Sequence, residues 1–191
     1  MKNFKAMRLT VAAFCIVINI IGAYIALSFK LPVYLDSIGT LLAAALLGPW
    51  YAMAAGMGSA FISGITSDIY AFYFMPVALI TGGVAGMLFR TPLFKGHRLP
   101  LGAMLLTVPG TAASASISAF LFGGVTSSGS SIFVQLLSHM GCNLVVSAFL
   151  VQIVTDYADR LLSLALVLVL ASCITAEMKI KLRGGQHCGT V

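Results

Sequence analysis

Three groups of polar and aromatic residues interrupt an otherwise apolar sequence. They lie in residues 30–36, in residues 67–74 and in residues 131–155. Aromatic faces beside a few directional hydrogen-bonding groups are typical of a pocket for a small organic molecule. The residues that we predict to bind such a molecule are Tyr34, Asp36, Asp68, Tyr70, Tyr73, His139, Asn143 and Gln152.

Each of these residues also has a purely structural interpretation. The tyrosines fit an aromatic belt at a membrane interface, and Asp36 and Asp68 fit helix caps. His139 stands three residues before Cys142. Two such ligands without a third partner do not favour a metal site, so we predict that the protein binds no metal.

The sequence contains no motif for nucleotide hydrolysis or nucleophilic catalysis. The patterns G-x-x-x-x-G-K-[ST] and H-E-x-x-H and a dinucleotide fingerprint are all absent. No serine has a histidine and an acid at a spacing that indicates a triad. We therefore expect a protein that is not an enzyme and has no cofactor of its own. The polar residues inside apolar segments are expected to hydrogen-bond or pack between helices; they are Asn19, Ser28, Ser59, Ser63, Ser114, Ser116 and Ser118.

The composition is that of an integral membrane protein. Of the 191 residues, 60% are hydrophobic and 8% are charged, against roughly 25% charged in soluble domains. The net charge of +6 comes mainly from basic clusters at the ends of apolar segments. This pattern indicates cytoplasmic loops of a bacterial plasma-membrane protein with both termini inside, and no nucleic-acid partner. The clusters are Lys2, Lys5 and Arg8; Arg90, Lys95 and Arg98; and Lys179, Lys181 and Arg183.

The apolar segments predict a single all-α membrane domain over residues 1–191 with six spans. A helix needs about 20 apolar residues to cross a bilayer. The second segment is shorter and ends at Gly48 and Pro49, so it needs neighbouring helices. The expected spans are residues 9–29, 37–47, 50–66, 71–89, 101–123 and 157–176.

Residues 131–155 are apolar but are not counted as a span. If they crossed the membrane, the last helix would place the C-terminal basic cluster outside, against the charge rule. We therefore expect a re-entrant or external hydrophobic segment that covers a cavity near the outer leaflet. The three groups of candidate binding residues meet on this outer side.

Two stretches of the sequence resemble a known family, and so does the six-span layout. They are KLPVYLDSIGTLLAAALLGPWYAMAAG, residues 30–56, and DYADRLLSLALVLVL, residues 156–170. The chain is similar to the S-components, the substrate-binding subunits of energy-coupling factor (ECF) vitamin transporters. The resemblance implies a subunit that captures a vitamin outside with high affinity. It then delivers the vitamin through a transmembrane coupling protein driven by two ABC-type ATPases.

The resemblance also suggests a ligand and a docking face. The chain is most similar to the cobalamin-specific type, although another vitamin such as riboflavin fits the same residues. S-components commonly dock the coupling protein through small residues on the first helix, and the counterparts expected here are Ala12, Ala13, Gly22 and Ala26. The alternatives are a stand-alone secondary carrier and a structural membrane subunit with no ligand of its own. Every acidic residue falls near the end of a predicted segment, which disfavours ion coupling at the membrane midplane.

Overall fold

The described part of the chain is all helical. The computed structural model describes residues 2–94, 96–124, 126, 128–175, 178, 179 and 182. Its α-helices are Lys2–Ser28 (α1), Ile38–Leu47 (α2), Pro49–Thr66 (α3), Ile69–Tyr73 (α4), Met75–Leu88 (α5), Leu99–Phe122 (α6), Ser131–His139 (α7) and Leu144–Cys173 (α8). Two 3-10 helices, Pro92–Phe94 (η1) and Gly96–Arg98 (η2), lie between α5 and α6.

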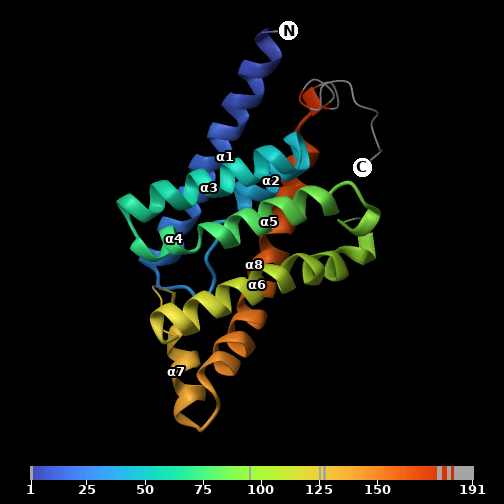
Figure 1. The fold of residues 1–191 in the computed structure, drawn as a ribbon. Coiled ribbons are helices and arrows are strands. Elements are labelled where there is room, and N and C mark those ends of the chain that lie inside the picture. The colour runs from blue at the N-terminus through green and yellow to red at the C-terminus, as the bar shows by residue number, and fades with distance from the viewer. Residues whose placement is uncertain are drawn as a thin grey trace.

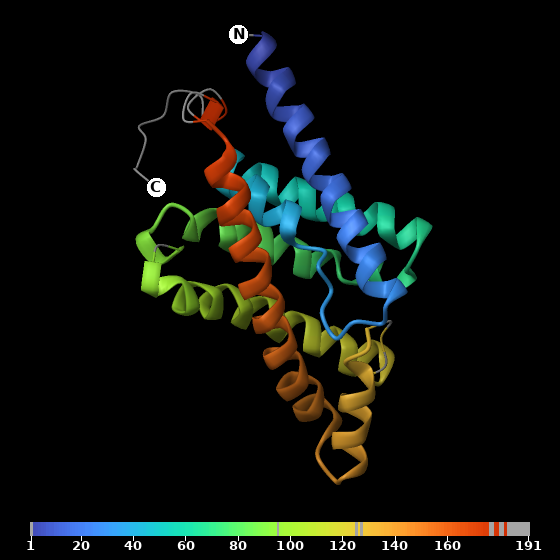
Figure 2. The same cartoon turned by 180° about the vertical axis from the view of Figure 1, so that it is seen from behind.

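The long helices form a layer crossed by two others. Helices α3, α5 and α6 lie side by side, and α1 and α8 cross one face of this layer (Figures 1 and 2). The start of α1 and the end of α8 lie at the same end of the molecule. Helix α7 and the first turns of α8 form a hairpin that projects beyond α6 (Figure 2).

Helix α2 is short and almost entirely enclosed, as its sequence predicts. Its residues from Gly39 to Leu46 are buried, and it packs against α1, α3, α5 and α8. It ends at Gly48, whose φ of +94° favours glycine, and Pro49 begins α3. A helix that is apolar on all sides requires this position inside a bundle.

Asn19 on α1 joins three helices at the centre of the fold. Its side-chain amide donates to Thr40 Oγ1 on α2 at 2.8 Å and to Ser59 Oγ on α3 at 3.1 Å. Its carbonyl oxygen accepts from the backbone N–H of Gly39 at 2.7 Å and of Thr40 at 3.2 Å. It therefore satisfies donors at the start of α2, where an N-cap side chain would normally do so. The predicted role of Asn19 and Ser59 in joining helices is confirmed.

The helix predicted over residues 71–89 is divided in the structure. Helix α4 ends at Tyr73, and α5 begins at Met75 with Pro76 in its first turn. Proline is suited to that position because its missing N–H would have no partner there. The aromatic entry to the predicted helix is thus a separate turn of helix.

The segment 131–155 does not form a unit separate from the last helix, so its predicted end is corrected, while its re-entrant or external position stays a prediction. Its first part is α7, whereas its second part belongs to α8, which continues through residue 156 to Cys173. The chain turns at Gly141, with a φ of +96°, and Asn143 caps the new helix. Asp156 and Asp159 do not end the helix because α6 and the loop of residues 29–37 hydrogen-bond to their carboxylates.

Two helices of the described chain are long and apolar enough to cross a bilayer. They are Lys5–Ser28 and Gly96–Phe122, while Ile38–Leu47 and Met75–Leu88 are apolar but shorter. The all-helical fold is therefore confirmed, and the six-span arrangement stays a prediction. Lys95, Lys181 and Arg183, which support that arrangement in the sequence, lie outside the described residues.

The central role of Asn19 can be tested by its removal. Asn19→Ala leaves donors and acceptors of α2 and α3 buried without partners, and we expect it to lower the free energy of unfolding by about 3 kcal/mol. Thermal unfolding in detergent, followed by circular dichroism, measures the change. Ser116→Ala is the control, because Ser116 is exposed and bonds only within α6. Equal unfolding temperatures for both variants would contradict the assigned role.

Candidate functional site

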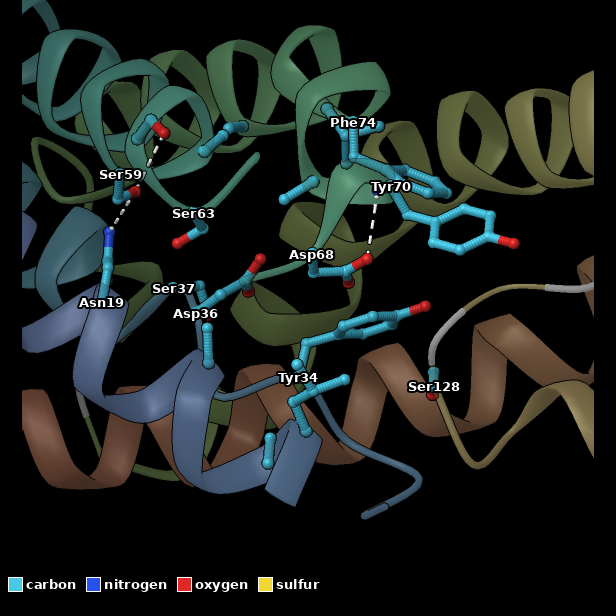
Figure 3. A pocket seen from close by; sticks show the side chains of 18 of the residues that line it. Asn19, Tyr34, Asp36, Ser37, Ser59, Ser63, Asp68, Tyr70, Phe74 and Ser128 are labelled. Carbon is cyan, nitrogen blue, oxygen red and sulfur yellow. Dashed lines mark hydrogen bonds between the residues drawn. The ribbon is translucent and has the colours of Figure 1, made fainter. Parts of the chain in front are cut away.

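A cavity of about 120 Å³ lies at the end of the molecule where α1, α3 and α6 finish. Its walls come from α1, α3, α5, α8 and the loop of residues 29–37, together with residues 67–74. Figure 3 shows Tyr34, Asp36, Asp68 and Tyr70 arranged around this space. The structure therefore brings the first two predicted groups together, and Gln152 of the third group also lines the cavity.

The loop of residues 29–37 is fixed by a carboxylate of α8. Asp159 Oδ1 accepts from the backbone N–H of Leu35 at 2.9 Å, and Asp159 Oδ2 accepts from Ser37 Oγ at 3.3 Å. Leu35 has a φ of +52°, which is unusual for a residue with a side chain. A Cβ atom at Gly22 would collide with the Leu35 carbonyl oxygen, so glycine permits the close approach of loop and helix. This arrangement places Tyr34 and Asp36 on the cavity wall.

Asp36 faces the cavity from within the protein. Its side chain lines the cavity and is accessible there. The protein atoms around the cavity nevertheless shield the carboxyl group from bulk water, and this burial raises its pKa to about 6. Arg160 opposes this rise, while Asp159 and Asp156 add to it. The Asp36 carboxyl group therefore changes charge in the mildly acidic range.

Tyr34 connects the loop to residue 126. Its hydroxyl group lies 3.2 Å from Thr126 Oγ1. Burial raises the pKa of Tyr34 to about 12, so the phenol stays protonated and can donate a hydrogen bond at neutral pH. Close to it, the N–H of Gly129 approaches the carbonyl oxygen of Leu31 at 3.4 Å. The loop of residues 29–37 thus meets Thr126 and residues 128–130 at one side of the cavity.

The opposite wall contains a carboxylate and aromatic rings. Asp68 caps α4 by accepting from the N–H of Tyr70 at 3.1 Å, and it also lines the cavity. The Tyr70 ring packs edge-on against Phe122, with centroids 4.8 Å apart. Phe74 lines the cavity beside Tyr70. The cap interpretation of Asp68 is therefore correct and compatible with a place in the site.

Helix α8 contributes polar groups from its middle. Gln152 Oε1 accepts from Ser114 Oγ at 3.0 Å, and Asp156 Oδ2 accepts from Thr111 Oγ1 at 2.7 Å. Both residues line the cavity. The observation that every acid lies near a segment end is thus wrong for Asp156 and Asp159, because they occupy the interior of a 30-residue helix.

Three predicted binding residues lie away from the cavity. Tyr73 is 49% exposed, with its ring 5.2 Å from that of Phe122. His139 is the exposed last residue of α7, and Asn143 accepts from the N–H of Val145 as a helix cap. None of the three lines the cavity. The prediction for the last two depends on residues 131–155 folding over the cavity, whereas the hairpin of α7 and α8 projects beyond α6 (Figure 2).

Sequence reasoning missed Thr81 and Arg160, which also line the cavity. Arg160 follows Asp156 by one helical turn, and this spacing indicates a shared face if the segment is taken as one helix. Thr81 stands beside two glycines inside an apolar segment and has no distinguishing signal in the sequence.

Most of the predicted docking residues face the inside of the protein. Ala12 and Ala26 are buried, Ala26 lines the cavity, and Gly22 lies against Leu35. The assignment of these three to a partner surface is therefore corrected. Ala13 is exposed on α1 and remains available for docking.

The anchoring of the loop by Asp159 leads to a measurable expectation. Asp159→Ala removes the acceptor of Leu35 N–H and Ser37 Oγ, so the loop of residues 29–37 should open more often. We expect faster tryptic cleavage after Lys30, identified by mass spectrometry. Thr155→Ala is the matched control because the Thr155 hydroxyl bonds only to its own helix. An unchanged cleavage rate in Asp159→Ala would show that the loop is held by other contacts.

Comparisons with known proteins do not identify a family or a function for the chain. No family model, curated protein or solved structure matches the chain. The resemblance to S-components therefore rests on the residues quoted for it, and the candidate site rests on the positions of its own side chains.

Proposed function

We propose that this chain is the ligand-binding subunit of an ECF-type importer in a bacterial plasma membrane. It captures a small organic molecule, a vitamin or a part of one, in the cavity between the loop of residues 29–37 and α8. The observation that carries the proposal is a cavity lined by aromatic rings, carboxylates and an amide at the end where three helices finish. Such a wall binds and orients a ligand through ring contacts and directional hydrogen bonds.

A position in the membrane is supported by the outer surface of the helices. Phe14 on α1, Phe120 on α6 and Val154 on α8 are exposed, and two helices are long and apolar enough to cross a bilayer. Large apolar side chains on several helices need a cover, and lipid supplies one. Delivery then requires the partners that the family resemblance implies, a coupling protein and two ABC-type ATPases.

The size of the cavity bears on the identity of the ligand. Its 120 Å³ leave room for on the order of ten water molecules. A corrinoid is several times larger, so cobalamin would enter only if the loop of residues 29–37 and residues 128–130 moved apart. We therefore favour a smaller ligand over the cobalamin that the overall resemblance suggests.

A stand-alone secondary carrier is the second candidate, and one observation favours it. Asp156 and Asp159 lie in the interior of α8, where ion-coupled carriers place ionisable residues. Against this, Asp159 anchors a loop and Asp156 accepts hydrogen bonds from α6, so both have structural partners. The subunit interpretation remains the better supported of the two.

Binding in the cavity predicts the effect of removing its rings. Tyr34→Ala and Tyr70→Ala should each weaken binding by about 1 to 3 kcal/mol, because packed ring area and a hydrogen bond are lost. The measurement is the amount of organic molecule that co-purifies with each variant, released by denaturation and quantified by mass spectrometry. Asn143→Ala is the control, since Asn143 caps a helix outside the cavity. Full retention of the molecule in both tyrosine variants would place the site elsewhere.

The need for a partner predicts the behaviour of the isolated chain in liposomes. We expect no accumulation of the co-purified molecule by the chain alone, and ATP-dependent accumulation when the coupling protein and ATPases are present. Ala13→Trp should reduce that accumulation but not binding, because close helix contacts in lipid depend on small residues. Ala13→Ser keeps the size small and should transport normally. Accumulation by the chain alone supports the carrier instead.

A further inference from the structure

The wall of the cavity carries an excess of negative charge. Asp36, Asp68 and Asp156 line it, and Arg160 is the one lysine or arginine among the described lining residues. Arg160 Nη1 lies 3.5 Å from Asp159 Oδ2, and its charge also acts on Asp36, so this one cation is shared among several carboxylates. The remaining carboxylates face a space that is partly shielded from water, where like charges repel more strongly than in bulk solvent.

One buried hydroxyl group of the wall has no partner among the described residues. Thr81 on α5 is 2% exposed and lines the cavity, yet its Oγ1 makes no hydrogen bond there. Buried polar groups are nearly always satisfied, and an exception at a cavity indicates a missing ligand or water. The hydroxyl group can either donate to or accept from a bound molecule.

The aromatic rings restrict the kind of positive charge that fits. Tyr34, Tyr70 and Phe74 line the same cavity, and their ring faces attract cations while covering apolar surface. No cluster of three metal-ligating side chains is found within the described residues. An organic cation uses both the rings and the carboxylates, whereas a bare metal ion would leave the rings unused.

We propose that the cavity selects an organic cation, a small aromatic or heterocyclic molecule whose protonated or quaternary nitrogen lies between Asp36 and Asp156. This inference rests on the proposed function, because it names the chemical class of the ligand for the same cavity. The ring of the ligand packs against Tyr34 and Tyr70, and the Thr81 hydroxyl group forms a hydrogen bond with the ligand. Anions of the same shape are excluded because they meet carboxylates in place of cations.

The titration of Asp36 agrees with this selectivity. The pKa of about 6 of its carboxyl group reflects burial first, and Asp159 and Asp156 of α8 raise it against the effect of Arg160. The other ionisable groups of the cavity wall are Tyr24, Tyr34, Asp68 and Tyr70. A bound cation favours the ionised carboxylate, so affinity for a cation should rise as the pH increases through about 6.

Three probes that share one ring and differ in charge test the proposal. They are benzylammonium, benzyl alcohol and benzoate, titrated into the full chain in lipid nanodiscs from which the co-purified molecule has been removed. We expect benzylammonium to bind about tenfold or more tightly than benzyl alcohol, and benzoate to bind more weakly than both. The preference for benzylammonium should decrease between pH 7.5 and pH 5, as Asp36 becomes protonated.

Variants assign the selectivity to the named carboxylates. Asp36→Asn and Asp156→Asn should each reduce the preference for benzylammonium over benzyl alcohol, while benzyl alcohol still binds. Thr81→Val keeps the shape of the side chain and should weaken binding of the ammonium and the alcohol alike. Asn143→Asp adds a charge at the exposed cap of α8 and should leave all affinities unchanged. Retained binding of benzyl alcohol shows that the two asparagine variants are folded, and an unchanged unfolding temperature shows the same for Thr81→Val.

The outcomes separate this inference from the proposed function. Equal affinities for the three probes, or tighter binding of benzoate, overturn cation selectivity even when an organic molecule co-purifies with the chain. The proposed function then stands without it. If no probe binds and no organic molecule co-purifies, the proposed function fails as well.

Discussion

The hydrogen bonds from the loop of residues 29–37 to Asp159 are the interaction on which the site depends. The loop contains the positive φ of Leu35 and approaches α1 at Gly22, so it does not hold its shape through its own preferences. A carboxylate in the middle of α8 fixes it by accepting from Leu35 and Ser37. Tyr34 and Asp36 flank this anchored residue and for that reason reach the cavity together. The link between a loop early in the chain and the last helix therefore creates the site.

Asp159 also explains why charged residues occur inside an apolar helix. A charge buried in a helix bundle is tolerated when hydrogen bonds and an opposite charge surround it. Asp159 has Leu35, Ser37 and Arg160, and Asp156 has Thr111 and Ser114. Within one turn of helix, the polar section of α8 thus anchors a loop and lines the cavity.

The sequence predicts most helices and two groups of site residues, and it fails where tertiary contacts decide. Gly48 and Pro49 mark the end of a short buried helix, and the predicted joining role of Asn19 and Ser59 is confirmed by their hydrogen bond. The charges of residues 156–160 suggest a loop between two helices. The residues that stabilise these charges inside the helix lie on α6 and in residues 29–37, and the sequence does not reveal such distant partners. That error placed His139 and Asn143 at the cavity. The inward direction of Gly22 was also hidden, since small residues suit internal packing and partner docking equally well.

Native mass spectrometry of a variant with a filled cavity tests the central claim most directly. Ala60 lines the cavity from α3, and Ala60→Trp places an indole ring in the space proposed for the ligand. The wild-type chain should carry an organic molecule as an added mass, and Ala60→Trp should carry none while unfolding at the same temperature. The same added mass on a folded Ala60→Trp variant would contradict binding in this cavity.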